Sequence, residues 1–267
     1  MSGWSLDERA HAGAEHLDPT YVADYERKSG FDPAEDIEVL RRHGLHPGSV
    51  LLDMGAGTGA LAAAVAPLCR TVIAVDVSPA MTRALRARVE ADGLANVTVV
   101  EAGILSYEHD AGEVDVVFTR NVLHQLPDFW KGIALARLFA LLRPGGVLRL
   151  LDLVFDCDPA DAPRTIEEWF AGAATDPALG FTAQELAAHV RSEFSTYSWL
   201  LEPMLERVGF RIVDRAYRRS AYGVYTCIRP PAPAAPTATG DGPRPTGGEP
   251  RPGPPPAPRA FLRGAGG

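Results

Sequence analysis

The chain has 267 residues and a formal net charge of −8 at neutral pH. An acidic chain lacks the basic surface that nucleic-acid binding requires, so we expect neither DNA nor RNA as a general partner. The three cysteines are isolated, which argues against a disulfide framework or a C-x-x-C zinc site and fits a reducing compartment.

No stretch reaches about 18 apolar residues, the length that a membrane helix needs. The first nine residues also lack the basic-then-apolar order of a secretory signal peptide. We therefore expect a soluble, cytoplasmic protein with no membrane partner.

The composition divides the chain into three predicted parts. Residues 1–46 are polar and broken by Pro and Gly, and we expect a helical lid. Residues 47–229 form one large domain, in which 160–208 is a helical insertion on the substrate side. Residues 230–267 contain 12 Pro and 8 Gly and carry a charge of +2, which leaves −10 on the rest of the chain. Such a segment cannot offset its ordering entropy, so we predict a disordered tail, with a Pro-rich docking segment as the alternative.

Apolar segments alternate with helical patterns along the main domain. After short helices at 21–28 and 36–43, the expected strands are 50–53, 71–76, 96–101, 113–119, 147–155, 210–217 and 222–228. The expected helices between them are 60–66, 78–93, 128–142, 161–174, 182–194 and 198–208. Alternation predicts a parallel, doubly wound sheet, and the short connection between the last two strands permits only an antiparallel pair. Thr182 and Glu185 predict a capping box at one helix start, and Ser78 a cap at another.

A glycine-rich turn comes after the first predicted strand. Asp53 ends that strand, and Gly55, Gly57 and Gly59 come next at alternate positions before a helix. Strand, glycine turn and helix form a nucleotide-binding layout, in which a ligand lies against the backbone. The spacing is neither the G-x-G-x-x-G of dinucleotide sites nor a phosphate loop with Gly-Lys-Ser/Thr. A carboxylate facing the turn would repel phosphate, so the turn predicts an adenosine-like ligand that carries positive charge.

This arrangement resembles the class I S-adenosylmethionine-dependent methyltransferases over residues 45–229. The resemblance rests on the strand-Asp-x-Gly-x-Gly-x-Gly motif, a second strand ending in Asp76, five alternating units and the terminal hairpin; the Pro-Gly-Gly at 144–146 is also typical. It implies an α/β fold with a Rossmann-like, seven-stranded sheet, mostly parallel, whose last strand is inserted antiparallel. It also implies S-adenosylmethionine as the cofactor, whose sulfonium and ammonium supply the predicted positive charge.

The resemblance assigns the cofactor-binding residues. The three glycines would lie against methionine and ribose, Asp53 would act on the methionine end, and Asp76 would accept hydrogen bonds from both ribose hydroxyls. Val77 would flank adenine, and Asn121 would lie near the methionine portion. Charge-assisted hydrogen bonds contribute about 1.5–3 kcal/mol each before desolvation. From the residues alone, Asp53 could instead be an acid that caps or stabilises the turn. Asp76 could instead cap the helix that begins at Ser78.

The loop after the third strand would close the adenine pocket at Gly103 and Ile104. Here the sequence departs from the Gly-Asp that is common in the family. An acidic contact to the adenine amino group is therefore missing or comes from elsewhere, such as Glu101. An ordinary strand-end loop is the alternative.

His124 comes after the fourth strand, in the segment that lies over the transferable methyl group in the family. An unperturbed imidazole titrates at about pH 6.5, so His124 is a candidate general base for a substrate oxygen or nitrogen. The alternative is a histidine that orients the loop or packs over the cofactor.

Acceptor-binding residues are expected on the variable N- and C-terminal elements, and the candidates are Tyr25, Trp130, His189 and Tyr197. His189 and Glu193 are four residues apart on a predicted helix and so share a face. The pair could be a substrate clamp, a metal pair or a surface contact. Methyl transfer from a sulfonium needs no metal, and we expect no metal centre.

The leading hypothesis is an enzyme that moves a methyl group from S-adenosylmethionine to a small-molecule nucleophile by in-line displacement. One alternative is an enzyme that binds this cofactor but transfers another group. Another is a catalytically silent S-adenosylmethionine-binding regulatory or scaffold protein. The sequence does not indicate an oligomeric state.

Overall fold

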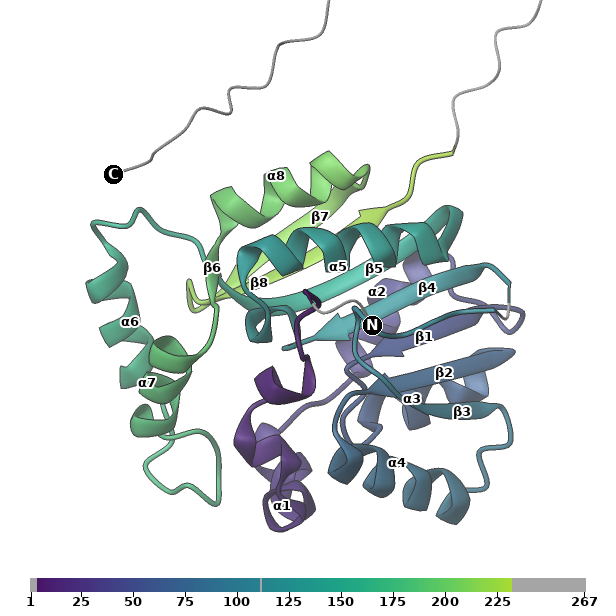
Figure 1. Ribbon diagram of the computed structural model, residues 1–267, viewed down its shortest axis with the longest axis horizontal. Helices are drawn as coiled ribbons and strands as arrows, with labels where there is room; N and C mark the ends of the chain where they lie inside the picture. The colour runs from purple at the N-terminus through teal and green to yellow at the C-terminus, as the bar shows by residue number, and fades with distance from the viewer. Residues whose placement is uncertain (1–3, 111, 232–267) are drawn as a thin grey trace, which may run out of the picture. The chain divides into compact units, whose positions relative to one another are not determined.

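The computed structural model describes residues 4–110 and 112–231. A central sheet carries helices on both faces, and helices separate its parallel strands along the chain except between the third and the fourth, which a loop joins (Figure 1). The first five strands are β1 (Val50–Met54), β2 (Thr71–Asp76), β3 (Val97–Glu101), β4 (Val114–Arg120) and β5 (Leu142–Phe155). These five strands run parallel, as predicted.

The sheet order is β3-β2-β1-β4-β5-β8-β7. β8 (Tyr222–Ile228) pairs antiparallel with both β5 and β7 (Arg211–Arg218), so the last strand is inserted between them. This confirms the predicted seven-stranded, mostly parallel sheet with its terminal hairpin. An additional strand of two residues, β6 (Thr196–Tyr197), pairs with the end of β5 and was not predicted.

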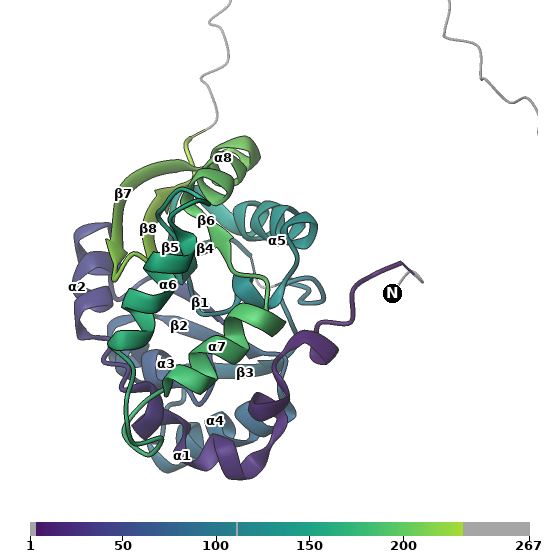
Figure 2. The ribbon, with the colours of Figure 1, turned by 90° about the vertical axis from the view of Figure 1, so that its left-hand side faces the viewer.

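Helices bury both faces of the sheet (Figures 1 and 2). One face packs against α5 (Asp128–Leu141) and α8 (Ser198–Val208), and the other against α2 (Ala34–Arg42), α3 (Ala60–Val65) and α4 (Pro79–Ala91). Because side chains alternate along a strand, neighbours belong to different cores: Leu52 packs with the first group and Leu51 with the second. Among the described residues, no helix combines the length and apolar character needed to cross a bilayer.

Most of the remaining elements gather at the carboxyl ends of the parallel strands. They are the short 3-10 helices Arg9–His11, Ala14–Leu17 and Leu123–Gln125, together with α1 (Pro19–Ser29), α6 (Ala162–Ala171) and α7 (Ala183–Ser192). A further 3-10 helix, Ala66–Leu68, lies at the opposite end of the sheet, between α3 and the start of β2. The predicted capping box starts α7: the Thr182 hydroxyl accepts from Glu185 N–H at 3.3 Å, and the Glu185 carboxylate accepts from Thr182 N–H at 2.8 Å. The lid role of residues 1–46 stays a prediction, and the predicted tail lies outside the described residues beyond position 231.

β5 begins five residues earlier than predicted. The Pro-Gly-Gly at 144–146 was expected to precede the strand, yet it pairs with the end of β8: Gly145 N–H donates to the Arg229 carbonyl at 2.7 Å, and Arg229 N–H donates to the Gly146 carbonyl at 2.9 Å. A Cβ at Gly146 would lie 3.1 Å from the Asp115 carbonyl oxygen, so glycine permits this close approach. A long-range partner therefore sets this boundary.

Candidate functional site

The glycine turn after β1 has a backbone conformation that other residues rarely adopt. Gly55, Gly57 and Gly59 have φ angles of +79°, +55° and +88°. A Cβ at Gly55 would lie 2.1 Å from Val122, and one at Gly59 would lie 2.1 Å from Leu85. The missing side chains therefore let the loop after β4 and helix α4 approach the turn.

Asp76 lies at the carboxyl end of β2 and faces the turn. Its Oδ2 accepts a hydrogen bond from Gly57 N–H at 2.8 Å, and its Oδ1 accepts one from Ser78 N–H at 2.9 Å. The Ser78 hydroxyl caps α4 by accepting from Met81 N–H at 3.2 Å, as predicted. These bonds fix the orientation of the Asp76 carboxylate and leave each oxygen a lone pair for a ligand hydroxyl. Burial raises the pKa of Asp76.

Asp53 is buried at the base of the same turn, with 2% of its surface exposed. Its Oδ2 has no hydrogen-bond partner among the described residues. Burial raises the pKa of Asp53 to about 7, and repulsion from Asp76 adds to the rise. A buried carboxylate oxygen without a partner carries an unfavourable desolvation cost, which a cationic ligand would reduce.

A cleft with about 710 Å³ of space not filled by protein atoms opens at the carboxyl ends of β1, β2 and β4. The predicted cofactor residues that line this cofactor cleft are Gly55, Gly57, Asp76, Val77, Gly103, Ile104 and Asn121. Asp53 lines an adjoining cavity, together with Gly55 and Gly57. Gly59 lies behind the turn, where it begins α3. All the predicted cofactor positions except Gly59 thus border one or both of two neighbouring cavities, which share Gly55, Gly57 and Asn121.

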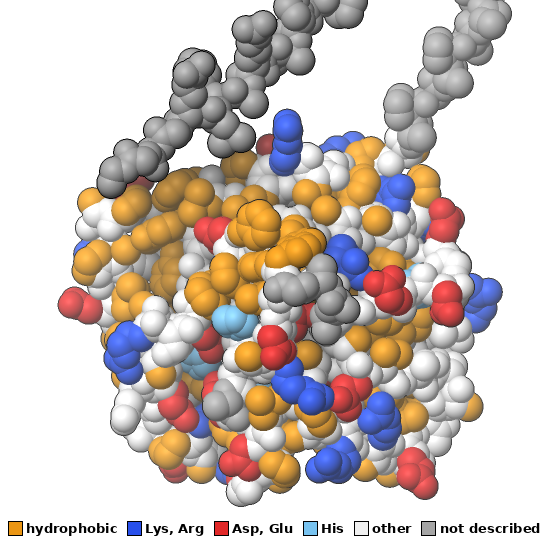
Figure 3. Space-filling view, in the orientation of Figure 1, with side chains coloured by type: hydrophobic (Ala, Val, Ile, Leu, Met, Phe, Trp, Pro, Cys, Tyr) orange, Lys and Arg blue, Asp and Glu red, His pale blue; other side chains and the backbone are white. Residues whose placement is uncertain are grey.

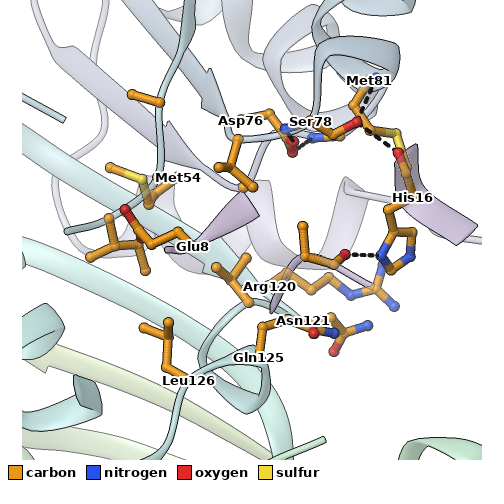
Figure 4. A pocket seen from close by; sticks show the side chains of 18 of the residues that line it. Glu8, His16, Met54, Asp76, Ser78, Met81, Arg120, Asn121, Gln125 and Leu126 are labelled. Carbon is orange, nitrogen blue, oxygen red and sulfur yellow. Dashed lines mark hydrogen bonds between the residues drawn. The ribbon is translucent and has the colours of Figure 1, made fainter. Parts of the chain in front are cut away.

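Asn121 lies across the cofactor cleft from Asp76 and Ser78 (Figure 4). It has a φ of +54°, which is uncommon for a residue other than glycine. Its N–H donates to the Leu151 carbonyl at 2.8 Å, and this bond ties the tip of β4 to β5. This conformation of Asn121 directs the loop after β4 along the cofactor cleft, where Asn121 and Val122 are lining residues.

Glu8 lines the cofactor cleft from the N-terminal part of the chain, and sequence reasoning missed it. Its Oε1 accepts from Leu105 N–H at 2.9 Å, and its Oε2 accepts from the Ser106 hydroxyl at 2.9 Å. Glu101, named as a source of an acidic contact, instead pairs with Arg9 at 2.5 Å and does not border the cleft as the described residues define it. No sequence signal links Glu8 to a loop 97 residues away.

A second cleft, with about 1110 Å³ of space, adjoins the first and shares Gln125 with it. The residues that line it are Ala10, His11, Gly13, Glu15, Tyr21, Gln125, Phe181, Glu185, Ala188, His189, Ser192, Glu193 and Phe194. Residues 8–16, here called the shared wall, contribute to both clefts: positions 8, 12 and 16 line the first, and 10, 11, 13 and 15 line the second. Figure 3 shows histidine side chains beside acidic ones on this face, next to a broad hydrophobic area.

His189 and Glu193 lie in the wall of the second cleft. His189 Nδ1 is 2.7 Å from Glu193 Oε1, and the two side chains are 16% and 8% exposed. Gln125 donates to the same Glu193 oxygen at 3.0 Å. With Nδ1 engaged, His189 Nε2 is the nitrogen left for a ligand. Glu15 lies near the pair, and ligand atoms of the three residues fall within 4.8 Å of one another, close enough to hold one metal ion.

His124 is buried behind this pair. Its Nδ1 lies 2.6 Å from Asp152 Oδ1, and its Nε2 lies 3.4 Å from Glu193 Oε2. Burial by itself would lower the pKa of His124, but the two carboxylates outweigh it and hold the pKa above the ordinary value. Burial would likewise raise the pKa of Glu193, yet the hydrogen bond from His189 and the charge of His124 hold it below its ordinary value. His124 borders neither cleft as the described residues define them.

Comparisons with known proteins agree with this geometry. Residues 51–146 match the model of a family described as a methyltransferase domain. An uncharacterized methyltransferase from Schizosaccharomyces pombe is 34% identical over 101 residues, which span 38% of this chain and 38% of that protein. A solved SAM-dependent methyltransferase from Aquifex aeolicus has a TM-score of 0.55 and 20% identity, and the match covers 79% of this chain and 98% of that one.

Residues 51–146 therefore carry a methyltransferase domain, and the fold around them is that of the class I S-adenosylmethionine-dependent methyltransferases. A second solved structure, the (4+2)-cyclase SpnF, has a TM-score of 0.63 at 15% identity and covers 85% of this chain and 97% of its own. These two structures, both below 25% identity, share the fold alone with the methyltransferase described here.

The cofactor of this methyltransferase is S-adenosylmethionine, and the residues present fit it. The unpartnered Asp53 oxygen suits the positive charge at the methionine end, and the oriented Asp76 carboxylate suits a ribose diol. At Gly57 the nearest non-neighbouring atom to the position of a Cβ is a carbon of the Tyr25 ring, at 3.7 Å, so this ring contacts the turn between them. Val77 and Gly103 line the same cleft, and the prediction that they contact adenine stays a prediction.

The predicted acceptor residues of the methyltransferase separate in space. Tyr25 lines the cofactor cleft, against the glycine turn, whereas His189 lines the second cleft. Trp130 stacks on Trp4 at 5.8 Å between ring centroids, and Tyr197 stacks on a neighbouring tryptophan at 5.1 Å. Neither of these two borders the clefts as the described residues define them, so their role in acceptor binding stays a prediction.

Proposed function

We propose that the protein transfers the methyl group of S-adenosylmethionine to a small molecule held in the second cleft. The observation that carries the proposal is the adjacency of the two clefts through Gln125. In-line displacement from a sulfonium demands mainly positioning, which can contribute about 7–11 kcal/mol when the nucleophile is held near its line of attack. An acceptor in the second cleft would approach the cofactor from the side of the shared wall.

The charges of the second cleft favour an acceptor that carries an amino group. Glu15, Glu185 and Glu193 line it. The chain's own Lys28 pairs with Glu185 and lies 5.5 Å from the centroid of the Tyr21 ring, so an ammonium is already held there between a carboxylate and an aromatic face. Glu15 remains to offset the charge of a bound ammonium, whereas Glu193 already accepts from His189 and Gln125.

An ammonium must lose a proton before its nitrogen can attack the methyl group. We assign that proton to His189 Nε2, because Nδ1 is held by Glu193. The amine lone pair then forms the N–CH₃ bond while the S–CH₃ electron pair passes to sulfur. His124, predicted as the base, lies behind Glu193, and we assign it a positioning role through that carboxylate.

Calorimetric titration tests the cofactor half of the proposal. We expect micromolar binding of S-adenosylmethionine and S-adenosylhomocysteine and none of NAD. Asp76→Ala removes the ribose acceptor and should weaken binding about tenfold or more. Asp92→Ala, at an exposed acid beyond α4, is the matched control and should leave the dissociation constant unchanged. Failure of the unaltered protein to bind either sulfur ligand would contradict the proposal.

Transfer of an isotopically labelled methyl group to a panel of small amines, phenols, thiols and carbon acids tests the other half. We expect amines to be methylated, and His189→Ala to lower kcat about a hundredfold or more while cofactor binding persists. Cofactor binding without transfer to any acceptor would favour the regulatory or scaffold alternative. Activity that is lost to a chelator and restored by Mg²⁺ would instead place a metal ion at Glu15, His189 and Glu193.

A further inference from the structure

Glu8 occupies the space that a side chain at position 103 would fill. A Cβ built on Gly103 would lie 2.3 Å from the Glu8 carboxyl carbon and 2.4 Å from both of its oxygens. Glycine at 103 is thus required for the Glu8 carboxylate to reach the loop after β3. Glu8, on the shared wall, thus places a carboxylate beside the loop after β3, which has no acidic residue at positions 102–106.

The loop holds this carboxylate in a fixed orientation. Leu105 N–H and the Ser106 hydroxyl each donate to a different Glu8 oxygen at 2.9 Å. Each oxygen keeps a further lone pair. The adjacent Ile104 N–H has no acceptor among the described residues. An oriented acceptor and a free donor therefore lie side by side at this end of the cofactor cleft.

The edge of adenine presents the complementary pattern, since N1 accepts one hydrogen bond and the neighbouring amino group donates two. With the ribose on Asp76, as proposed above, the base would lie along Val77, Gly103 and Ile104, which line the same cleft. We propose that the Glu8 carboxylate accepts a hydrogen bond from the adenine amino group of the bound cofactor, in place of the carboxylate that the loop at Gly103 and Ile104 lacks. This rests on the cofactor use in the proposed function, which binding to the unaltered protein tests separately.

The experiment compares S-adenosylhomocysteine with its analogue in which purine replaces adenine, so that only the amino group is missing. The unaltered protein should bind the analogue about tenfold more weakly or worse, the value of one hydrogen bond to a charged group. Glu8→Ala should lower affinity for S-adenosylhomocysteine and bring the ratio of the two dissociation constants close to one. Glu8→Gln, which keeps the size of the side chain, should reduce the same ratio.

Arg9→Ala provides the matched control. It removes the neighbouring anchor of the shared wall to Glu101 and keeps the Glu8 carboxylate, so it should weaken both ligands equally and preserve the ratio. Gly103→Asp in the Glu8→Ala background should restore discrimination by supplying a carboxylate at the same place. An undiminished ratio in both Glu8 variants would overturn the proposal, as would a ratio of one in the unaltered protein when it binds S-adenosylhomocysteine.

Discussion

Two buried carboxylates with raised pKa values lie at the glycine turn, and both are proposed to bind the cofactor. Asp53 and Asp76 both lose hydration at the glycine turn, and the charge of Asp76 further opposes ionisation of Asp53. Asp76 recovers part of that loss through two backbone N–H groups, whereas Asp53 Oδ2 has no partner among the described residues. A cofactor ammonium bound at the turn, as proposed, would therefore favour the ionised form of Asp53 more than that of Asp76.

Cofactor affinity should depend on pH through Asp53. The pKa of this carboxyl is raised to about 7, so it is protonated below that pH and must lose its proton to pair with the cofactor ammonium. Affinity for S-adenosylhomocysteine should rise by about tenfold per pH unit between about pH 5.5 and 7, and then level off. Calorimetry in two buffers of different ionisation enthalpy would detect the released proton. Asp53→Asn should flatten the profile, and an equally steep profile in this variant would assign the proton to another group.

At the scale of elements, one buried ion pair joins α2 to the sheet. Arg149 on β5 contacts Asp36 on α2 through Nε and Nη2, each at 2.8 Å, and also donates to Thr226 on β8 at 3.0 Å. The Arg149 and Asp36 side chains are 2% and 5% exposed. Arg149 therefore links α2, in the N-terminal part of the chain, to the adjacent strands β5 and β8.

Asp36→Ala should destabilise the protein by about 3–5 kcal/mol, because it leaves the Arg149 charge buried without its partner. Urea unfolding followed by circular dichroism measures this change. The matched control is Asp24→Ala, which removes a pair with Arg27 whose side chains are both more than half exposed. The control should cost less than about 1 kcal/mol. Equal losses in the two variants would show that burial does not control the strength of the Asp36 pair.

Local features of the elements could be predicted from the sequence, and long-range ones could not. The caps at Ser78 and Thr182 depend on donors three residues away, so their patterns were sufficient. The start of β5 depends on Arg229, and the Glu8 carboxylate depends on a loop 97 residues away. Helical spacing likewise predicted that His189 and Glu193 share a face. The contact between His124 and Glu193 depends on the fold and could not be predicted.

At the scale of the whole molecule, Arg229 ties the end of the hairpin to α5, and we expect the domain to need no residue much beyond it. Its guanidinium donates to the carbonyls of Phe139, Ala140 and Leu142, at 2.9, 3.1 and 2.5 Å, and so satisfies groups at the end of α5. The residues beyond it are rich in Pro and Gly and offer little apolar surface. Stability should therefore depend on Arg229 and be nearly independent of residues 232–267.

Truncation after Pro231 should leave the Tm and the cofactor affinity nearly unchanged, because the Arg229 contacts are kept. Truncation after Ile228 should lower the Tm by several degrees, at roughly 2–4 °C per kcal/mol for a domain of this size. Differential scanning calorimetry of the two proteins measures both effects. A large loss in the protein that ends at Pro231 would show that the terminal segment packs on the domain.

The shared wall has a kinetic consequence. Positions 8, 12 and 16 line the cofactor cleft while positions 10, 11, 13 and 15 line the second cleft, so one short segment shapes both. If adenine binds Glu8, as proposed, the cofactor orders the shared wall. The second cleft then takes its final shape before the acceptor binds. We therefore expect a compulsory order, with S-adenosylmethionine first on and S-adenosylhomocysteine last off. S-adenosylhomocysteine should then inhibit competitively against S-adenosylmethionine and noncompetitively against the methyl acceptor.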